Sequence, residues 1–548
     1  MPAGPVYPET GTRSWRPGPR IHERTPVPMS AAQQYDTVVV GAGLVGGLLA
    51  AEATRRGRRI ALIEAGPRFD FANRMAQLRH HQVFGGLRWP YENPERDRYT
   101  DSSPQSIGVR YLLESHRCKG VGGSTLHWGG RINRLLPADF KTRTTYGTGV
   151  DWPISYEELE PYYSRADWEL GVSGTHHPSL PPRSRDYPNP GFPMSVDDQL
   201  WVPVAERMGI SIYPAPFAIN SRPYGGRSQC AALASCEICP SGARYSADFH
   251  IAEAERTGLC DVFSETVARR IDLDSGGEVR AVHVSTLDRQ SREIRGSRYV
   301  VAAHAVESAR LLLLSNCGNQ SDQVGRNFME HVYVSANGML PGRRFYPKRV
   351  GYEVLESLGY YTGADRRERG GIKLEFVYGD WDPLNDMEGK RLWGSSLARY
   401  DRNTFGHWVG IEAETEQLPN PDSRVTLDPK VRDLFGDPVP HLNLAFSDVD
   451  RRTQQRARDI TQNLLSAAGV KDIAQDKLSS TSFGAHHLGT CRMADDPREG
   501  VVDRDCRVHG ISNLYVAGGS VFPTSGALQP SSTIAALALR LADHLWPA

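Results

Sequence analysis

Short apolar runs alternate with a helical pattern near the start of the chain. The β-branched run Thr37–Val40 predicts a buried strand, and a helical pattern follows Gly46. A second apolar run, Ile60–Ile63, predicts another strand, which ends at the acidic residue Glu64. Strand, helix and strand in this order predict a βαβ unit, and therefore an α/β fold with a parallel sheet.

Three glycines occupy the turn between the first strand and the helix. Gly41, Gly43 and Gly46 have the G-x-G-x-x-G spacing of a dinucleotide fingerprint. Gly41 permits a tight turn, Gly43 lets the backbone approach a pyrophosphate, and Gly46 lets the helix pack closely on the strand. Glu64 lies 64 − 41 = 23 residues later, where a carboxylate can accept hydrogen bonds from a ribose. The context favours a bound dinucleotide over a purely structural turn.

A second strand–glycine–helix pattern lies near the other end of the sequence. Residues 513–517 predict a strand that runs into Gly518, Gly519 and Ser520, and residues 531–544 predict a helix. Two such units far apart in the sequence suit a long cofactor held at both ends. The N-terminus of the second helix can also stabilise the negative charge of a reduced flavin.

Six blocks of the sequence resemble, in order, those of the glucose–methanol–choline (GMC) oxidoreductases, a family of FAD-dependent alcohol oxidases and dehydrogenases. The resemblance extends from about Tyr35 to the end. The blocks are residues 41–64, 120–129, 300–315, 324–331, 486–493 and 501–524. Block 151–163 is similar to the catalytic subunits of bacterial gluconate, fructose, glucose and glycoside 3-dehydrogenases. The resemblance implies a Rossmann-like FAD-binding domain interleaved with an antiparallel-sheet substrate domain.

The same resemblance implies the chemistry. A base removes the proton of a substrate hydroxyl while the carbon delivers hydride to flavin N5. The family's base lies in a His-x-x-Gly-Thr motif, which here begins at His486, and histidine titrates near neutral pH as such a base requires. The alternative is a core histidine. The neighbouring His487 is interpreted as a packed residue or as a donor behind the base.

The family's second catalytic position departs from the usual pattern. It is a His or Asn in the family and corresponds here to Gln529, whose amide can orient a hydroxyl but cannot accept its proton. On this interpretation His486 is the sole base. The alternative is that Gln529 is a turn residue before Pro530.

Residues 120–129 are expected to lie against the flavin. Gly122 and Gly123 let the backbone approach a planar ring, and Ser124 follows them. In pyranose oxidases and some of the similar sugar dehydrogenases, the histidine at the position of His127 is bonded covalently to the flavin, while other members lack that bond. Covalent attachment, non-covalent contact and a structural role all stay open for His127. By family position, Val267 is a candidate adenine contact.

Three of the eight cysteines are close in sequence. Cys230, Cys236 and Cys239 precede a proline, which is typical of iron–sulfur ligands. Several of the similar dehydrogenase subunits carry a three-cysteine, three-iron cluster in a similar place, which passes electrons to a haem partner, although their last spacing is usually one residue longer. The alternatives are zinc, with His250 as a fourth ligand, and plain thiols.

Charge and composition exclude other classes. Lys+Arg and Asp+Glu are equal at 64 each, so no net field attracts nucleic acid or an anionic membrane. No apolar run approaches the roughly 18 residues of a transmembrane helix. The first 34 residues are rich in proline and arginine and lack the apolar core of a secretory signal. They predict a disordered tail and a cytoplasmic protein; periplasmic export with a small partner subunit stays open, because the similar dehydrogenase subunits often lack a signal of their own.

These patterns divide the chain into interleaved segments. The segments are a disordered tail (1–34), three parts of the FAD-binding domain (35–159, 225–334 and 479–548), a loop-rich lid (160–224) and an antiparallel substrate sheet (335–478). Ser155 and Glu158 predict a capping box at a helix start. Candidate substrate contacts in the sheet are Tyr360, Glu375, Trp408 and Glu412.

Together the patterns predict an FAD-dependent dehydrogenase that oxidises a hydroxyl of a sugar or glycoside. Its electrons would pass to a haem protein or a dye rather than to O₂. The first alternative is a sugar oxidase of the pyranose-oxidase type, which produces hydrogen peroxide. A second alternative, from another class, is a flavin-binding protein without redox turnover.

Overall fold

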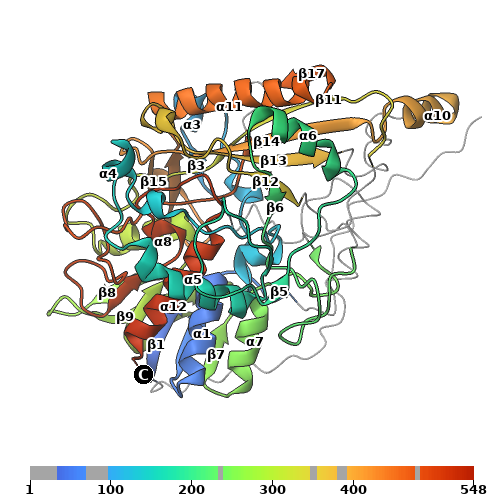
Figure 1. Cartoon of the computed structure of the whole chain (residues 1–548). Coiled ribbons are helices and arrows are strands. Elements are labelled where there is room, and N and C mark those ends of the chain that lie inside the picture. The colour runs from blue at the N-terminus through green and yellow to red at the C-terminus, as the bar shows by residue number, and fades with distance from the viewer. Residues whose placement is uncertain are drawn as a thin grey trace, which may run out of the picture. The chain divides into compact units, whose positions relative to one another are not determined.

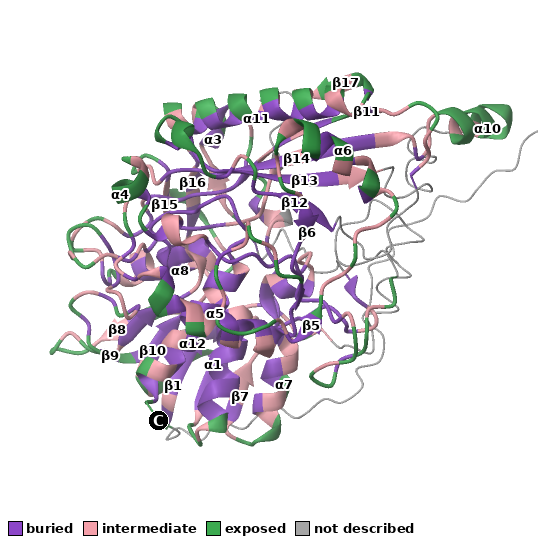
Figure 2. Cartoon of the chain, viewed as in Figure 1, coloured by how far each residue is buried: buried purple, intermediate pink, exposed green. Residues whose placement is uncertain are grey.

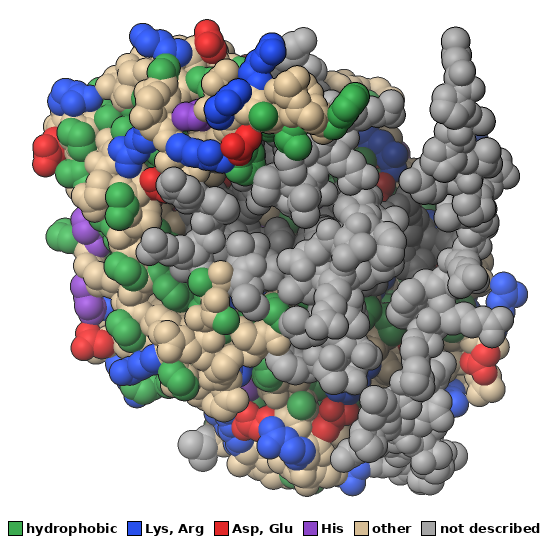
Figure 3. Space-filling model, turned by 90° about the vertical axis from the view of Figure 1, so that its right-hand side faces the viewer, with side chains coloured by type: hydrophobic (Ala, Val, Ile, Leu, Met, Phe, Trp, Pro, Cys, Tyr) green, Lys and Arg blue, Asp and Glu red, His purple; other side chains and the backbone are tan. Residues whose placement is uncertain are grey.

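The computed structural model describes residues 34–69, 97–232, 238–345, 354–378, 392–475 and 482–547. Residues 1–33 of the predicted disordered tail and Cys236 lie outside the described residues. The chain from Gln34 onward forms one unit. Each helix among the described residues is too short or too polar to cross a lipid bilayer. Both signs of charge are present on the described part of the face in Figure 3, as the balanced totals predict.

A seven-stranded sheet carries both glycine turns. Its strand order is β7-β2-β1-β10-β9-β8, with β19 paired to β10. The pairs among β7, β2, β1, β10 and β19 are parallel, and β8 and β9 extend the sheet antiparallel. The strands are β1 (Gln34–Val40), β2 (Ile60–Ile63), β7 (Cys260–Phe263), β8 (Thr266–Leu273), β9 (Val279–Thr286), β10 (Ser291–Val301) and β19 (Leu514–Val516). The predicted βαβ unit and its C-terminal counterpart therefore belong to one sheet.

Helices cover this sheet. α1 packs against α7 and α12, α5 packs on α12, and α8 packs on β8 (Figure 1). The bounds are α1 (Leu44–Arg55), α5 (Tyr156–Leu170), α7 (Asp248–Arg256), α8 (His304–Ser315) and α12 (Ser531–Leu545). The predicted capping box is present, because the Ser155 hydroxyl accepts from the backbone of Glu158 and the Glu158 carboxylate accepts from that of Ser155. The boundary predicted at residues 159/160 falls inside α5.

A second seven-stranded sheet is antiparallel, as the predicted fold class requires. Its order is β17-β11-β14-β13-β12-β6, with β18 paired to β11. The strands are β6 (Tyr213–Pro214), β11 (Val332–Met339), β12 (Leu355–Ser357), β13 (Ile372–Tyr378), β14 (Trp408–Thr415), β17 (Lys471–Gln475) and β18 (Ser482–Phe483). α11 (Asp448–Ala467), which was not predicted, packs on β11 and β14 (Figure 1). The predicted fold class, a Rossmann-like domain interleaved with an antiparallel sheet, is confirmed.

The two faces of β13 and β14 differ in polarity. Alternate residues join the apolar core with α11, namely Ile372, Leu374, Phe376, Val409, Ile411 and Ala413. The intervening positions carry Lys373, Glu375, Glu412 and Glu414. Because strand side chains alternate between faces, these charged residues share the face opposite α11. Figure 2 shows that both strands are largely buried, so the charged face is covered as well.

Shorter elements complete the described chain. They are α3 (Ser103–Ile107), α4 (Thr142–Tyr146), α6 (Val202–Met208), α10 (Gly394–Asn403), β3 (Thr100–Asp101), β4 (Ser173–Gly174), β5 (Asn189–Pro190), β15 (Arg424–Arg432) and β16 (Pro438–Asn443). β15 and β16 form a hairpin, and β3 adds to it in parallel. The segment 160–224, predicted to be loop-rich, contains α6 and most of α5.

Candidate active site

A cavity of about 630 Å³ is lined by residues of both large sheets and of the loops between them. One part is lined by the β1–α1 turn, the end of β2 and the start of α8. Another part is lined by Tyr333, Glu375 and Glu412 of the antiparallel sheet. Residues 484–487 and 517–519 line it as well. The cavity therefore brings together most of the predicted site residues.

The first glycine turn has the geometry that the fingerprint predicts. Gly41 has φ of +109°, and a Cβ there would lie 2.3 Å from the Ala302 carbonyl oxygen. A Cβ on Gly46 would lie 2.2 Å from the Gly41 carbonyl oxygen, so neither position accepts a side chain. At Gly43 the nearest atom to an added Cβ is 3.8 Å away, in Gly123, and Gly43 lines the cavity. Gly43 thus leaves room for a group that approaches the backbone.

Glu64 supports this turn directly. Its Oε2 accepts a hydrogen bond from the Ala42 backbone N–H at 3.0 Å, and its Oε1 accepts one from Gly66 at 2.9 Å. Burial raises the pKa of Glu64 to about 7, although these bonds oppose the rise. Glu64 and Val267 both line the cavity. Their contacts with a ribose and an adenine stay predictions.

Three predicted cofactor contacts lie behind the cavity lining. Gly46, Gly122 and Ser520 are absent from the described lining residues. Gly122 has φ of +114° and donates its N–H to the Ala42 carbonyl, which ties residues 120–129 to the first glycine turn. Ser520 is 1% exposed, and its carbonyl accepts from the Cys491 N–H. These residues support the turns that line the cavity.

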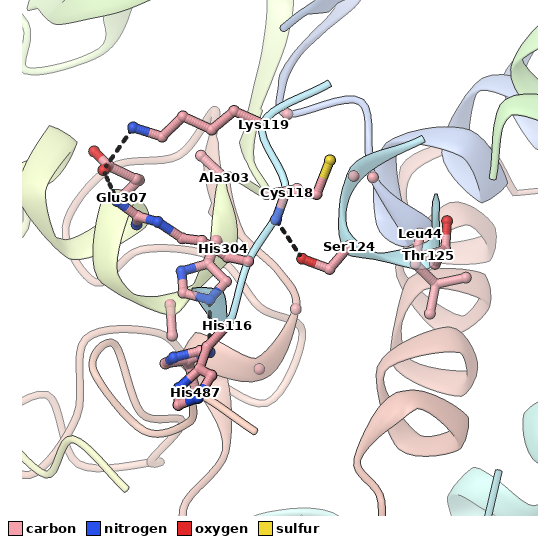
Figure 4. A pocket seen from close by; sticks show the side chains of 18 of the residues that line it. Leu44, His116, Cys118, Lys119, Ser124, Thr125, Ala303, His304, Glu307 and His487 are labelled. Carbon is pink, nitrogen blue, oxygen red and sulfur yellow. Dashed lines mark hydrogen bonds and ion pairs between the residues drawn. The ribbon is translucent and has the colours of Figure 1, made fainter. Parts of the chain in front are cut away.

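Other predicted contacts do line the cavity. They are Gly123, Ser124, His127, Gly518 and Gly519. The Ser124 hydroxyl accepts from the Cys118 N–H at 3.2 Å, as Figure 4 shows. Burial, together with the Arg244 charge, lowers the pKa of His127 to about 4. The imidazole of His127 is therefore neutral at physiological pH.

His486 presents one edge of its ring to protein groups. Its Nδ1 lies 3.0 Å from Glu414 Oε1 and 2.9 Å from His331 Nδ1. Its backbone N–H donates to Glu330 Oε1 at 2.7 Å, and a Cβ at Gly484 would collide with the ring. His486 lines the cavity, and its side chain is 15% exposed. Because Nδ1 is engaged with the protein, Nε2 is the ring nitrogen left for a ligand.

His487 is held by a different network. Its Nδ1 lies 2.8 Å from His304 Nε2 (Figure 4), and its Nε2 lies 2.6 Å from the Tyr111 hydroxyl. The Tyr111 hydroxyl donates to Glu330. Burial and the neighbouring His304 hold the pKa of His487 well below its usual range, so this ring is neutral. Both of its nitrogens are bound within the protein.

The Gln529 amide is also bound within the protein. Its Nε2 donates to Glu375 Oε1 at 2.9 Å and to Glu414 Oε2 at 3.0 Å, while its Oε1 accepts from Asn133 Nδ2 at 2.9 Å. An amide nitrogen has two hydrogens, so neither is left for a substrate hydroxyl. Gln529 lines the cavity, and its amide bridges the Glu375 and Glu414 carboxylates.

The cationic partners of these carboxylates were not predicted from the sequence. Lys373 Nζ lies 2.6 Å from Glu375 Oε1 and 2.5 Å from Glu414 Oε2, and Arg131 forms an ion pair with Glu375. Burial would raise the pKa of Glu414, but the Lys373 charge and the His331 hydrogen bond outweigh it and hold that pKa well below its usual range. The alternation along β13 and β14 was the available signal, since it places these charges on one face.

The four predicted substrate contacts divide into two pairs. Glu375 and Glu412 line the cavity together with Arg131 and Tyr333. Tyr360 packs instead against the apolar core beneath α11, and Trp408 is absent from the described lining. Position in the antiparallel sheet alone therefore did not identify the cavity face.

Two of the three clustered cysteines are described, and Cys236 lies outside the described residues. Cys230 Sγ accepts from the Ala232 N–H and Cys239 Sγ from the Arg244 N–H, both at 3.4 Å. Burial would raise the pKa of Cys239, but the bonds from Arg244 and Ser241 outweigh it and lower that pKa. A thiolate at Cys239 is therefore stabilised.

The zinc alternative fails at His250. Its Nδ1 lies 2.7 Å from the Tyr245 hydroxyl, and its Nε2 lies 3.1 Å from Glu169 Oε2. Both ring nitrogens are therefore engaged within the protein, and neither is free to bind a metal ion. His250 is a structural residue of α7.

Comparisons with known proteins agree with this architecture. Residues 192–333 and 419–538 match the N-terminal and C-terminal family models of GMC oxidoreductases. The chain is 30% identical to the fructose dehydrogenase large subunit of Gluconobacter japonicus, over 93% of this chain and 97% of that one. It is 29% identical to the 6'''-hydroxyparomomycin C oxidase of Streptomyces lividus, over 94% and 93%. The crystal structure of pyridoxine 4-oxidase from Mesorbium loti superposes with a TM-score of 0.64 at 18% identity, covering 93% of this chain and 99% of that one.

Proposed function

This chain belongs to the GMC oxidoreductase family, and from that premise we propose that it is a dehydrogenase that oxidises a hydroxyl of a sugar or glycoside. GMC oxidoreductases bind FAD. The residues present fit this cofactor, because two glycine turns line one cavity and Gly43 leaves space where a Cβ would stand. Bound FAD supplies the hydride acceptor of the reaction.

The observation that carries the proposal is the placement of His486. Its ring lines the cavity, with Nδ1 held by protein groups and Nε2 left over. In the proposed reaction, Nε2 accepts the proton of the substrate hydroxyl as the carbon gives up hydride. His487 is bound at both nitrogens and cannot act as this base without breaking its network. His486 is therefore the sole base of the proposed reaction.

The proposed substrate class rests on the cavity and on the Gluconobacter relative, which is named for fructose. Arg131, Tyr333, Glu375 and Glu412 offer several donors and acceptors in one part of the cavity. Such a surface suits a ligand with many hydroxyl groups. Glu412 and Tyr333 line the cavity and are the proposed direct contacts.

The test is anaerobic reduction of the bound flavin by a panel of aldoses, ketoses and glycosides. Reduction is measured as the loss of the visible absorbance of the flavin. We expect at least one sugar to bleach the flavin, and His486→Ala to slow this bleaching by about 10³-fold while retaining FAD. His283→Ala is a matched control, because His283 is partly exposed on β9 and absent from the described cavity lining. Unaltered reduction in His486→Ala would refute the assignment.

An oxidase is the second candidate, because the Streptomyces relative is named as one. An oxygen electrode separates the two activities. We expect the reduced protein to react slowly with O₂ and rapidly with an artificial dye. Stoichiometric hydrogen peroxide at a comparable rate would favour the oxidase.

We propose that electrons leave through an iron–sulfur cluster held by Cys230, Cys236 and Cys239, toward a haem partner. The support is chemical: Cys239 Sγ accepts a backbone hydrogen bond from Arg244 and its pKa is lowered, which favours a thiolate ligand. Iron analysis of anaerobically purified protein tests this, and less than one iron per chain would contradict it. Cell fractionation, alone and with a co-expressed partner subunit, tests the accompanying proposal of export to the periplasm.

Attachment of FAD to His127 is a separate proposal. The neutral imidazole of His127 lines the cavity and suits bond formation to the flavin. Acid precipitation is the measurement: a yellow pellet supports a covalent bond, and a colourless pellet with a yellow supernatant contradicts it.

A further inference from the structure

Glu414 stands between the candidate base and a buried cation. On one side its Oε1 lies 3.0 Å from His486 Nδ1 and 2.7 Å from His331 Nδ1. On the other side its Oε2 lies 2.5 Å from Lys373 Nζ and accepts from Gln529 at 3.0 Å. Glu414 is 0% exposed, and so is Lys373. Both carboxylate oxygens are therefore fixed by partners on opposite sides.

The sheet register creates this arrangement. Lys373 of β13 and Glu414 of β14 are directly opposite each other in the antiparallel ladder, and Glu375 is opposite Glu412. Tyr333 of β11 is opposite Glu414 on the other side. Directly opposite side chains in adjacent strands lie on the same face and close together. A shift of one residue would turn Lys373 or Glu414 toward the apolar face beneath α11.

A buried carboxylate stays ionised only with compensation. Burial alone would favour the protonated form of Glu414, and the Lys373 ammonium reverses this preference. The same ammonium binds Glu375, whose other oxygen faces Arg131. Lys373 and Arg131 thus compensate the charges of the Glu375 and Glu414 carboxylates, and buried Glu356 of β12 lies opposite Glu375. The charge of Glu414 is then available to the imidazole in front of it.

We propose that Glu414 is the positioning residue of the base: its carboxylate fixes the His486 ring with Nε2 toward the substrate and stabilises the imidazolium that forms there, while Lys373 keeps Glu414 ionised. The inference rests on the proposed function of His486. The O–H bond of the substrate hydroxyl breaks and its proton moves to Nε2 of His486. The carbon that bears this hydroxyl gives up hydride to the cofactor. Glu414 gains no proton, as with the carboxylates that orient catalytic histidines elsewhere.

This role explains the Gln529 departure. A second catalytic His or Asn at position 529 would contact the substrate directly, whereas the amide nitrogen of Gln529 donates its hydrogen bonds to Glu375 and Glu414. Gln529 therefore acts through Glu414. The groups that surround the Glu414–His486 pair are Lys373 and Glu375 of β13, Tyr333 of β11, and His116, Glu330, His331 and His487 of the loops.

The test is Glu414→Gln in the FAD-loaded protein, with two readouts. The first is the pH titration of the His486 ring resonance in ¹³C-histidine-labelled protein, assigned with His486→Asn. A carboxylate favours the protonated ring, so its removal should lower the titration midpoint by at least one pH unit. The second readout is the pH profile of flavin reduction, whose acid limb should move to lower pH while the plateau rate falls at least tenfold.

Two further variants separate positioning from general damage. Glu356→Gln neutralises another buried carboxylate, which contacts Asn133 on the far side of Gln529, and should leave the titration midpoint in place. Glu414→Asp keeps the charge but withdraws it by one methylene, and should shift the midpoint less than Glu414→Gln. An unchanged midpoint in Glu414→Gln, or an equal shift in Glu356→Gln, would overturn the proposal.

The two readouts also distinguish this proposal from the function on which it rests. If the midpoint shifts but no sugar reduces the flavin, the interaction of Glu414 with His486 is supported and the sugar dehydrogenase is rejected. If a sugar reduces the flavin but the acid limb does not move in Glu414→Gln, the sugar dehydrogenase is supported and the role of Glu414 is rejected.

Discussion

Single glycines decide how closely a cofactor can approach the backbone. Gly43 has φ of −90°, a conformation open to alanine, and an added Cβ would have no protein atom nearer than 3.8 Å. We expect Gly43→Ala to leave the melting temperature of FAD-free protein within about 2 °C of wild type, because nothing clashes. The methyl group should nevertheless reduce FAD affinity at least tenfold, since it occupies the cavity side of the turn. Fluorescence titration with FAD measures this.

Gly46 provides the contrasting variant. Its added Cβ would lie 2.2 Å from the Gly41 carbonyl oxygen, within the turn itself. Gly46→Ala should therefore lower the yield of folded protein, whether or not FAD is supplied. Unchanged FAD affinity in Gly43→Ala would show that the cofactor does not approach this part of the backbone.

A buried carboxyl should make stability depend on pH. Burial raises the pKa of Asp139 to about 7, although the Arg366 charge opposes the rise. The folded protein then keeps a proton that the unfolded chain loses above about pH 4. Stability contributed by this group is therefore lost as pH rises from about 4 to 7, by up to ~4 kcal/mol, and is constant above that.

Asp139→Asn tests this expectation by removing the ionisation while keeping an acceptor for the Leu136 N–H and the Tyr361 hydroxyl. Urea unfolding at pH 5, 6, 7 and 8 should show a flatter pH dependence in the variant than in wild type. Asp496→Asn is a control, because Asp496 lies at the surface and its pKa is lowered to about 2, well outside this range. Parallel pH curves for Asp139→Asn and wild type would contradict the expectation.

At the scale of elements, helix ends are the most testable features. The capping box at Ser155 closes the N-terminus of α5, which packs on α12. Ser155→Ala should cost about 1 kcal/mol of stability, because it leaves a backbone N–H of the first turn without its acceptor. Denaturant unfolding monitored by circular dichroism measures this. A loss below a few tenths of a kcal/mol would mean that the end of α5 frays in the wild type.

Local sequence patterns predicted the elements whose signals are local. β1, α1, β2, α5 and α12 follow from apolar runs, glycine spacing and capping residues. α11 was missed, although Ser447 and Asp450 form a capping box and Ala457, Ile460 and Leu464 share a buried face. The aromatic and charged residues around it were interpreted as a continuous sheet, so the helical period in residues 448–467 went unused.

The pairing of Glu414 with His486 could not be predicted in the same way. It depends on the register between β13 and β14, which are separated by residues 379–407, and on a loop that begins near residue 484. Sequence identifies His486 by its motif and shows that polar residues alternate on each strand. It does not state which strands are neighbours, because that is decided by packing between distant segments.

At the scale of the molecule, the β15–β16 hairpin closes one part of the cavity. Asp433, Leu434 and Phe435 at its tip line the cavity together with Val267. Arg269 of β8 holds the hairpin through Asp437, at 2.6 and 2.8 Å. The hairpin thus covers the part of the cavity where the adenine is predicted.

Removing this connection should loosen the cofactor without touching the cavity lining. We expect Arg269→Ala to speed FAD release several-fold on mild heating. The rise in the fluorescence of free flavin measures the release rate. Arg280→Ala is the matched control, because Arg280 forms ion pairs on β9, in the same sheet, and is absent from the described lining. Equal release rates for the two variants would mean that the hairpin does not retain FAD.

The middle position of β10 has a consequence for how the protein is made. β10 pairs with β1 on one side and β19 on the other, so the two glycine turns meet only after the ribosome has passed Val516. Between the synthesis of β10 and that of β19, the edge of β10 that later pairs with β19 has no partner. FAD binding can stabilise the fold only after both glycine turns have been synthesised. The flavin supply of the cell is therefore expected to act after translation, by raising the fraction of chains that remain folded.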